Sequence, residues 1–230
     1  MLLYLHGFAS GGGSFKARFF SRRLEALGLG LVVPELDEGD FEHLTLSGQL
    51  RLVERLCAAA DGPLVLIGSS LGAYLAALYA ARFPVAALVL MAPAIDFAGR
   101  LRERLGEQAI ERWRRRGTMP VFHNAHRREL ALGWELLADA AGHEPRPWVR
   151  APTLVLHGRH DAVVPLETVK AWTLGLPRAR LEVLESGHEL VDVAEALFER
   201  AQAFLAEIPE VAAAWPALAG SQGAREQRER

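Results

Sequence analysis

The chain has 230 residues, half of them apolar and 23% charged, which excludes a disordered, collagen-like or disulfide-framework protein. Lys and Arg number 26 and Asp and Glu number 28, so the net charge of −2 gives no positive field for binding phosphate backbones. The length is just below the ~250 residues at which a single hydrophobic core stops growing. We therefore expect one globular domain and no nucleic-acid partner.

The cysteine content and the first residues bear on the compartment. Cys57 is the only cysteine, and no cationic run followed by a long apolar stretch opens the sequence. Both observations favour a cytoplasmic protein. Residues 64–81 carry no charge, but Gly68-Ser69-Ser70-Leu71-Gly72 in their middle is typical of a strand, a tight turn and a helix, so we expect no membrane span.

Short apolar runs along the chain predict buried strands, and segments with helical spacing lie between most of them. The first helical segment follows Ser14, a candidate N-cap, and ends at Gly28, whereas the second ends before Gly62. Strands that alternate with helices favour an α/β fold, with a mostly parallel sheet of about six strands and helices on both faces. The expected strands are 2–5, 31–33, 64–67, 86–91, 153–157 and 181–184.

The regular alternation of predicted strands and helices is interrupted once. About 60 residues separate the strand that ends at Met91 from the next, far more than the ~2 to 6 residues usual in connecting loops. Residues 99–117 and 127–141 both have helical patterns, so we expect an insertion at about 95–150 that forms a small helical cap. From 209 to 230 the chain has little apolar periodicity, which predicts a flexible C-terminal tail after a single domain at 1–208.

The pentapeptide at 68–72 matches G-x-S-x-G, directly after a predicted strand and before an Ala-rich helix. In that context the pattern indicates a nucleophile elbow, where small residues on both sides let a sharp turn expose the serine hydroxyl. The spacing makes Ser70 the nucleophile and Ser69 the flanking residue. The alternative is a purely structural serine and glycine turn.

A serine hydroxyl needs a base to take its proton and a carboxylate to orient that base. His188 follows the last predicted strand, and Asp161 follows the strand before it, so both belong at the sheet edge where open α/β folds bind ligands. Asp96 is the second candidate for the acid. Glu185 and Asp192 lie near the histidine in sequence and are further candidates.

Acyl transfer also needs two donors for the tetrahedral oxyanion. We assign the N–H of Leu71, at a helix N-terminus, and the N–H of Phe8, in the loop after the first strand. The glycine run at 11–13 does not fit the phosphate-loop pattern G-x-x-x-x-G-K-[ST], because Lys16 comes too late. We interpret the run as flexibility beside the site.

Several histidines have spacings that suit metal ligands. His123 and His126 are three residues apart, and His157 and His160 flank the candidate acid. A single cysteine and no HExxH pattern favour structural roles instead. We expect no metal and no cofactor.

The segments Leu3-Tyr4-Leu5-His6-Gly7-Phe8, Ser14-Phe15-Lys16-Ala17 and 68–72 resemble the YqiA-like small bacterial esterases of the α/β-hydrolase superfamily. The middle of the chain, with Ala92-Pro93-Ala94, also resembles the mycophenolic acid acyl-glucuronide esterase and its bacterial relatives. The resemblance covers about 1–208 and implies a serine hydrolase acting on esters or thioesters, with Ser70, Asp161 and His188 at the matching positions.

The resemblance also implies an unusual sheet edge. The sequence opens on what resembles the third strand of the full superfamily fold, without the usual first hairpin. The strand edge left bare in this way can pair between subunits, so a homodimer is one expectation.

Aromatic and cationic residues of the predicted cap bear on the substrate. Trp113, Met119, Phe122 and Trp134 are candidates for an apolar acyl pocket, although aromatics at these spacings also pack helical layers. Residues 99–117 hold seven arginines against three glutamates, which either attract a carboxylate or phosphate of the substrate or form a solvated face.

The function that these residues favour is carboxylic ester hydrolysis through an acyl-serine intermediate, on a small-molecule acyl ester. The main alternative is an acyl-protein or acyl-CoA thioesterase, which would prefer thioesters to oxygen esters of equal chain length. A peptidase is disfavoured, because nothing marks a peptide site. A non-catalytic binding module on the same fold is the alternative from another class, and it predicts no covalent capture by a fluorophosphonate probe.

Overall fold

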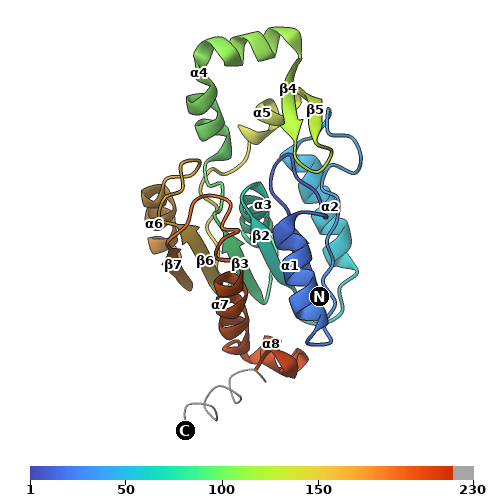
Figure 1. The fold of residues 1–230 in the computed structure, drawn as a ribbon, viewed down its shortest axis with the longest axis vertical. Coiled ribbons are helices and arrows are strands. Elements are labelled where there is room, and N and C mark those ends of the chain that lie inside the picture. Colours follow the sequence, from blue (N-terminus) through green and yellow to red (C-terminus); the bar gives the residue numbers. More distant parts are fainter. Residues whose placement is uncertain (220–230) are drawn as a thin grey trace.

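A computed structural model describes residues 1–219 and places a parallel sheet at the centre of the protein (Figure 1). All neighbouring strands pair in parallel, in the order β1-β2-β3-β6-β7. This confirms the predicted mostly parallel α/β architecture. The strands are β1 (Leu2–Leu5), β2 (Val65–Ser69), β3 (Ala87–Met91), β6 (Thr153–Gly158) and β7 (Ala179–Leu184).

The sheet has five strands, because residues 31–33 make only an isolated bridge to β1. The N–H of Tyr4 donates to the carbonyl of Val32 at 2.8 Å, and the N–H of Val32 donates to the carbonyl of Leu2 at 2.9 Å. Pro34 follows at once and has no N–H to continue the pairing. The outer edge of β1 is therefore partly covered rather than bare. Pairing between subunits stays a prediction.

Helices cover both faces of the sheet (Figure 1). Successive side chains along each strand point to opposite faces and pack in two separate cores. Along β2, Val65 and Ile67 join the core beneath α1 and α7, whereas Leu66 joins the core beneath α2, α3 and α6. All five strand residues of β2 are buried, as expected for a central parallel strand. These helices are α1 (Phe15–Glu25), α2 (Leu46–Ala58), α3 (Leu71–Ala80), α6 (Leu166–Leu174) and α7 (Ala194–Ala206).

The cap between β3 and β6 combines helices with a β-hairpin. Helix α4 (Phe97–Arg116) bends at Gly106, where φ is 73°, and runs across the top of the molecule in Figure 1. The hairpin of β4 (Thr118–His123) and β5 (Arg128–Gly133) is antiparallel, and the short α5 (Glu135–Ala140) follows it.

The prediction of a small helical cap is therefore wrong in part. The first half of the helix predicted at 127–141 is a strand. Gly117, with φ 76°, ends α4 in the left-handed conformation, and the chain then turns into the hairpin. In β5, Leu130 and Leu132 are spaced by two and point to the same side, which is the period of a strand rather than of a helix. The helical pattern holds only for α5.

The C-terminal residues pack against the domain. Helix α8 (Pro209–Ala214) and a single 3₁₀ turn (Pro216–Leu218) follow α7, and Val211 and Leu218 are fully buried in the α1 and α7 core. Residues 209–219 thus do not form the expected flexible tail, and the rest of that prediction, 220–230, lies outside the described residues. Within 1–219, no helix combines the length and the apolar character that crossing a membrane requires.

Candidate active site

Ser70 sits on a sharp turn between β2 and α3. Its backbone angles, φ 53° and ψ −116°, are unusual for a residue with a side chain, and its N–H donates to the carbonyl of Met91 at 2.9 Å. A Cβ on Gly68 would lie 2.5 Å from the Cα of Ala73, and one on Gly72 would lie 2.1 Å from the carbonyl oxygen of Leu5. Only glycine fits at both positions, which explains the spacing of the motif.

Three side chains from distant parts of the sequence form a hydrogen-bonded chain at this turn. Nε2 of His188 lies 2.9 Å from Oγ of Ser70, and Nδ1 of His188 lies 2.8 Å from Oδ2 of Asp161. The loops after β6 and β7 approach closely here, because a Cβ on Gly158 would lie 2.4 Å from the carbonyl oxygen of Gly187. The sequence-predicted nucleophile, base and acid are thus brought together.

Asp161 is held as a carboxylate. Burial of its side chain raises its pKa, but hydrogen bonds from His188 and from the backbone N–H groups of Val163 and Val164 outweigh burial and bring the pKa below 3.8. Oδ1 accepts both N–H groups at 2.8 Å. Nearby, burial lowers the pKa of His157, whose Nε2 donates to the carbonyl of Val164 at 2.9 Å. A charged acceptor therefore faces His188.

The other acid candidates lie in different surroundings. Asp96 is the N-cap residue of α4, with a left-handed backbone. Glu185 pairs with Arg159 and His160 on the surface. The carboxylate of Asp192 accepts the hydroxyl of Ser186 at 2.5 Å. Asp161 is the candidate that contacts the imidazole.

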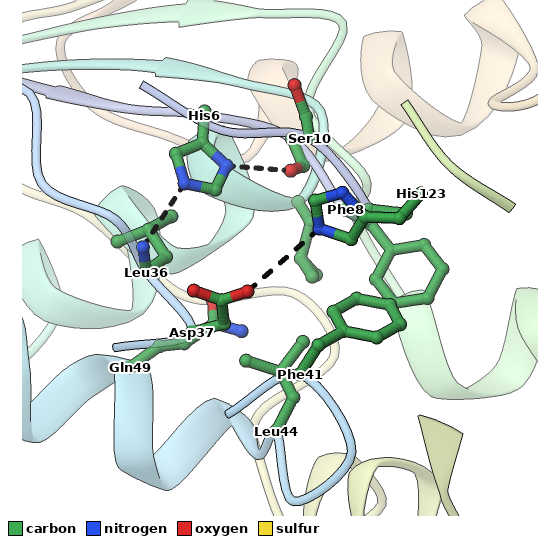
Figure 2. A pocket seen from close by; sticks show the side chains of 12 residues that line it. His6, Phe8, Ser10, Leu36, Asp37, Phe41, Leu44, Gln49 and His123 are labelled. Atoms are coloured by element: carbon green, nitrogen blue, oxygen red, sulfur yellow. Dashed lines mark hydrogen bonds and ion pairs between the residues drawn. The ribbon is translucent and has the colours of Figure 1, made fainter. Parts of the chain in front are cut away.

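Phe8 and Leu71, the predicted oxyanion donors, both line the cleft that Ser70 lines. Leu71 is the first residue of α3, where the N–H groups and the helix dipole favour negative charge. The ring of Phe8 is fixed between Phe41 and Phe97, at centroid distances of 5.8 and 6.2 Å. Phe8 and Leu71 also line a second, small cavity, and Figure 2 shows Phe8 among the side chains around it.

The cleft above Ser70 and His188 has a volume of about 1530 Å³ and runs between the sheet edge and α4. That volume exceeds the ~300 to 1,000 Å³ usual for small-molecule sites. Five cations against two acids make its lining electropositive. The cations are Lys16, Arg18, Arg100, Arg104 and Arg127, and the acids are Glu103 and Glu189.

Lys16 is buried, although sequence reasoning assigned it no role. Its Nζ donates to the carbonyl oxygen of Glu189, the residue after His188, and lies 3.8 Å from the Glu189 carboxylate. Burial lowers the pKa of Lys16. The lysine therefore ties α1 to the loop that carries the imidazole. Its place in the Ser14-Phe15-Lys16-Ala17 segment was the available clue.

The four residues predicted to line an acyl pocket belong to the cap itself. Trp113 is buried, donates from Nε1 to the carbonyl of Leu132 at 3.0 Å and meets Trp134 edge to face at 5.4 Å. Met119 and Trp134 pack against the same cap core, and Phe122 is 56% exposed. None of the four is among the residues that line the cleft: Trp113, Met119 and Trp134 pack within the cap, and Phe122 faces solvent.

The arginines of helix α4 fall into two groups with different surroundings. Arg114 and Arg115 pair with Glu111 on the solvated second half of the helix. Arg100 and Arg104, in the first half, line the cleft. The bend at Gly106 separates the two halves.

Comparison with protein families gives a match over residues 1–206 to the group described as uncharacterised protein family UPF0227. The chain belongs to this family. Its YqiA-like resemblance within the α/β-hydrolase superfamily is thereby confirmed. No curated protein matches the UPF0227 chain.

Solved structures share the fold of this UPF0227 protein at low sequence identity. Est1E from Butyrivibrio proteoclasticus, solved with ferulic acid, is 22% identical, with 89% of each chain covered and a TM-score of 0.71. Mouse alpha/beta hydrolase domain-containing protein 10 is 19% identical, covering 87% of this chain and 90% of its own, with a TM-score of 0.68. A protein of Agrobacterium vitis S4 is 22% identical over 88% and 87%, with a TM-score of 0.76. The chain therefore has the α/β-hydrolase fold.

Proposed function

We propose that this UPF0227 protein is a serine hydrolase that cleaves carboxylic esters through an acyl-serine intermediate. The observation that carries the proposal is the unbroken chain of hydrogen-bond distances from Ser70 Oγ through His188 to Asp161, at 2.9 and 2.8 Å, on the wall of an open cleft. That arrangement supplies a nucleophile, a base and an orienting carboxylate. The strained backbone of Ser70 holds the hydroxyl toward the imidazole.

In the first half of the proposed reaction, Ser70 Oγ attacks the acyl carbon and its proton passes to Nε2 of His188. Negative charge then develops on the carbonyl oxygen, where the N–H groups of Phe8 and Leu71 stabilise it. One such donor is typically worth ~2.7 to 4 kcal/mol of barrier. His188 next protonates the leaving alcohol as the carbon–oxygen bond breaks, which leaves the acyl group on Ser70.

In the second half, a water molecule attacks the acyl carbon and gives a proton to Nε2 of His188. Collapse of this second tetrahedral intermediate releases the carboxylic acid, and the proton returns to Ser70 Oγ. The Asp161 carboxylate keeps the proton of Nδ1 in place through both halves and stabilises the imidazolium that forms.

Two features of the cleft bear on the substrate of the proposed enzyme. Its volume of about 1530 Å³ suits an acyl ester larger than a simple acetate. The excess of cations along its lining favours a substrate that carries a carboxylate or phosphate. The same machinery acts on thioesters, so an acyl-protein or acyl-CoA thioesterase is the second candidate, favoured by this positive lining.

A fluorophosphonate probe with intact-mass detection tests the proposal. We expect one adduct on the wild-type protein, none on Ser70→Ala, and retained labelling of Ser10→Ala, whose serine lines the same cleft. Turnover of acyl esters and thioesters of graded, matched length then separates the two candidates. An unlabelled, inactive wild-type protein would favour the non-catalytic binding module instead.

A further inference from the structure

A small polar cavity is lined by the loop at residues 6–10, which we call the oxyanion loop because it carries Phe8 (Figure 2). Its volume is about 10 Å³, close to the space that one water molecule or ion occupies. Gln49 lines it and is 3% exposed, and its Oε1 has no hydrogen-bond partner among residues 1–219. Leaving such a buried acceptor unpaired costs ~1 to 3 kcal/mol, which points to a polar occupant of the cavity.

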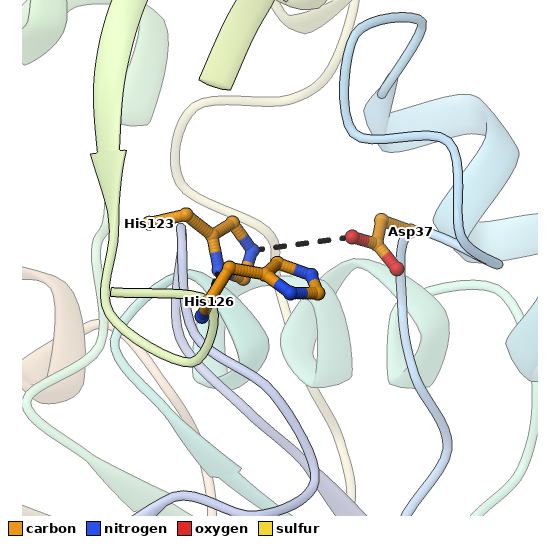
Figure 3. Close-up of side chains that lie close together, drawn as sticks. All are labelled: Asp37, His123 and His126. Carbon is orange, nitrogen blue, oxygen red and sulfur yellow. Dashed lines mark hydrogen bonds and ion pairs between the residues drawn. The ribbon is translucent and has the colours of Figure 1, made fainter. Parts of the chain in front are cut away.

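Two walls of this cavity, Asp37 and His123, form a cluster with His126 (Figure 3). Each residue offers a ligand atom, and the three atoms all lie within 4.8 Å of one another. His123 is 2% exposed and comes from the end of β4, whereas His126 is exposed at the hairpin turn. The cluster therefore runs from the buried cavity wall to the surface.

The separation of Asp37 and His123 suits a shared ligand better than a direct bond. Oδ2 of Asp37 lies 3.9 Å from Nε2 of His123, which is too far for a hydrogen bond. Two ligand atoms that are each about 2.0–2.2 Å from one tetrahedral zinc ion are roughly 3.3–3.6 Å apart. A contraction of a few tenths of an ångström between these two side chains would therefore admit an ion.

Both ring nitrogens of the neighbouring His6 already have hydrogen-bond partners within the protein. Its Nδ1 lies 2.9 Å from the carbonyl of Gly7, and its Nε2 accepts the N–H of Leu36 at 3.2 Å. Both ring nitrogens are used, so His6 supports the loop rather than offering a ligand atom.

We propose that Asp37, His123 and His126 bind one divalent transition-metal ion of the zinc type. Two imidazoles and a carboxylate are a donor set that zinc accepts, with water in the fourth position. His126 can reach the ion by a side-chain rotation, because it is exposed. When Nε2 of His123 binds the ion, its Nδ1 carries the proton and gives up the weak contact of 3.4 Å that it accepts from the backbone N–H of His126.

The ion would fasten the cap to the core. The hairpin turn already donates one hydrogen bond to the oxyanion loop, from the N–H of Asn124 to the carbonyl of Ala9 at 2.8 Å. A metal shared by the hairpin and Asp37 adds a second link, across the cavity that Phe8 and Leu71 line. This role is structural, and the proposal does not depend on the hydrolase proposal.

Titration of the full chain with Zn²⁺, followed by calorimetry and native mass spectrometry, tests the site. We expect one Zn²⁺ per chain, a rise in melting temperature that a chelator reverses, and a visible absorption band with Co²⁺. Asp37→Asn and His126→Gln should each weaken binding at least about tenfold. Neither residue is as deeply buried as His123, so these two changes should disturb folding less than a change at His123.

Two control variants keep the result specific. His43→Gln removes an exposed histidine that is already paired with Asp40, and His188→Gln removes the imidazole beside Ser70, so both should retain the bound Zn²⁺. No Zn²⁺ binding by the wild-type chain would overturn the proposal and leave a water molecule as the occupant. Equal affinity in the wild type, Asp37→Asn and His126→Gln would also overturn it, as would loss of binding in His188→Gln alone.

Discussion

Replacing Asp161 with asparagine tests the proposed proton relay, because the change keeps the shape of the side chain and removes its charge. Oδ1 accepts the N–H groups of Val163 and Val164, both at 2.8 Å, and Oδ2 accepts Nδ1 of His188 at 2.8 Å. The asparagine carbonyl keeps the two backbone bonds, so its NH₂ group turns toward His188. Nδ1 of His188 must then accept a hydrogen bond from this NH₂ group. The ring proton therefore moves to Nε2, the nitrogen that faces Ser70 Oγ.

An imidazole that carries its proton on Nε2 cannot take the proton of the Ser70 hydroxyl. We expect kcat to fall by about 10⁴, or ~5.4 kcal/mol of barrier at ~1.36 kcal/mol per factor of ten. The measurement is kcat and KM on an activated acyl ester, with the melting temperature recorded to show that the variant folds.

The matched control for this change is Asp192→Asn. The Asp192 carboxylate accepts a hydrogen bond from the hydroxyl of Ser186 in the same loop region, whereas the imidazole of His188 pairs with Asp161 and Ser70, so kcat should stay near the wild-type value. A folded Asp161→Asn protein that loses less than about one factor of ten, ~1.4 kcal/mol, would refute the assignment of the acid.

The elbow, a buried imidazole and the cationic cleft each give a further prediction. Gly72→Ala places a Cβ 2.1 Å from the carbonyl oxygen of Leu5, so urea unfolding should show a loss of at least ~1 to 3 kcal/mol in stability, with loss of turnover. Burial lowers the pKa of His157 below 6.5 in the folded state, so the unfolded chain binds that proton first, and the unfolding free energy should decrease as the pH falls from 6.5. Arg104→Gln with Arg127→Gln should lower kcat/KM for an ester bearing a carboxylate by about fivefold, on the order of 1 kcal/mol, with less effect at high salt.

Each of these three predictions has its own control. A Cβ on Gly30 would meet nothing within 4 Å, so Gly30→Ala should be far milder than the elbow variant. In the pH series, His157→Gln should flatten the slope below pH 6.5, and an unchanged slope would contradict the assignment. For the cleft, Arg114→Gln removes an arginine that pairs with Glu111, and it should leave the preference for charged esters intact. An equal loss on a neutral ester would show that the two cleft arginines do not act on substrate charge.

The central fold and the three side chains of the candidate site could be predicted because their requirements are local. A nucleophile elbow requires glycine at positions 68 and 72 for steric reasons. These two glycines therefore identify Ser70 from the local sequence alone. Parallel strands then bring their carboxyl ends to one edge, which places the residues after β6 and β7 beside that serine.

The features that escaped prediction depend on partners far away in sequence. The burial of Lys16 depends on the carbonyl of Glu189, 173 residues later. Asp37 lies in an irregular segment, and nothing in its neighbourhood indicates that His123 will meet it. Sequence periodicity reports which side of an element is buried, but not which distant element covers that side.

Two predictions that the structure contradicts concern residues 31–33 and the cap. Residues 31–33 are apolar like the other strands, yet Pro34 removes the donor that a longer ladder would need. In the cap, the arginine and the two leucines of β5 fit a helical pattern over a few residues as well as a strand pattern. Cross-strand pairing with β4, which no single segment can reveal, decides between them.

The packing of the C-terminal residues has a practical consequence for handling the protein. The family match ends at residue 206, but Val211 is 0% exposed and Leu218 is 1% exposed in the core beneath α7. A recombinant chain that ends at the family boundary would lack both of these core residues and expose an apolar surface to water. Such a surface favours self-association and precipitation. Expression boundaries should therefore extend at least to residue 219.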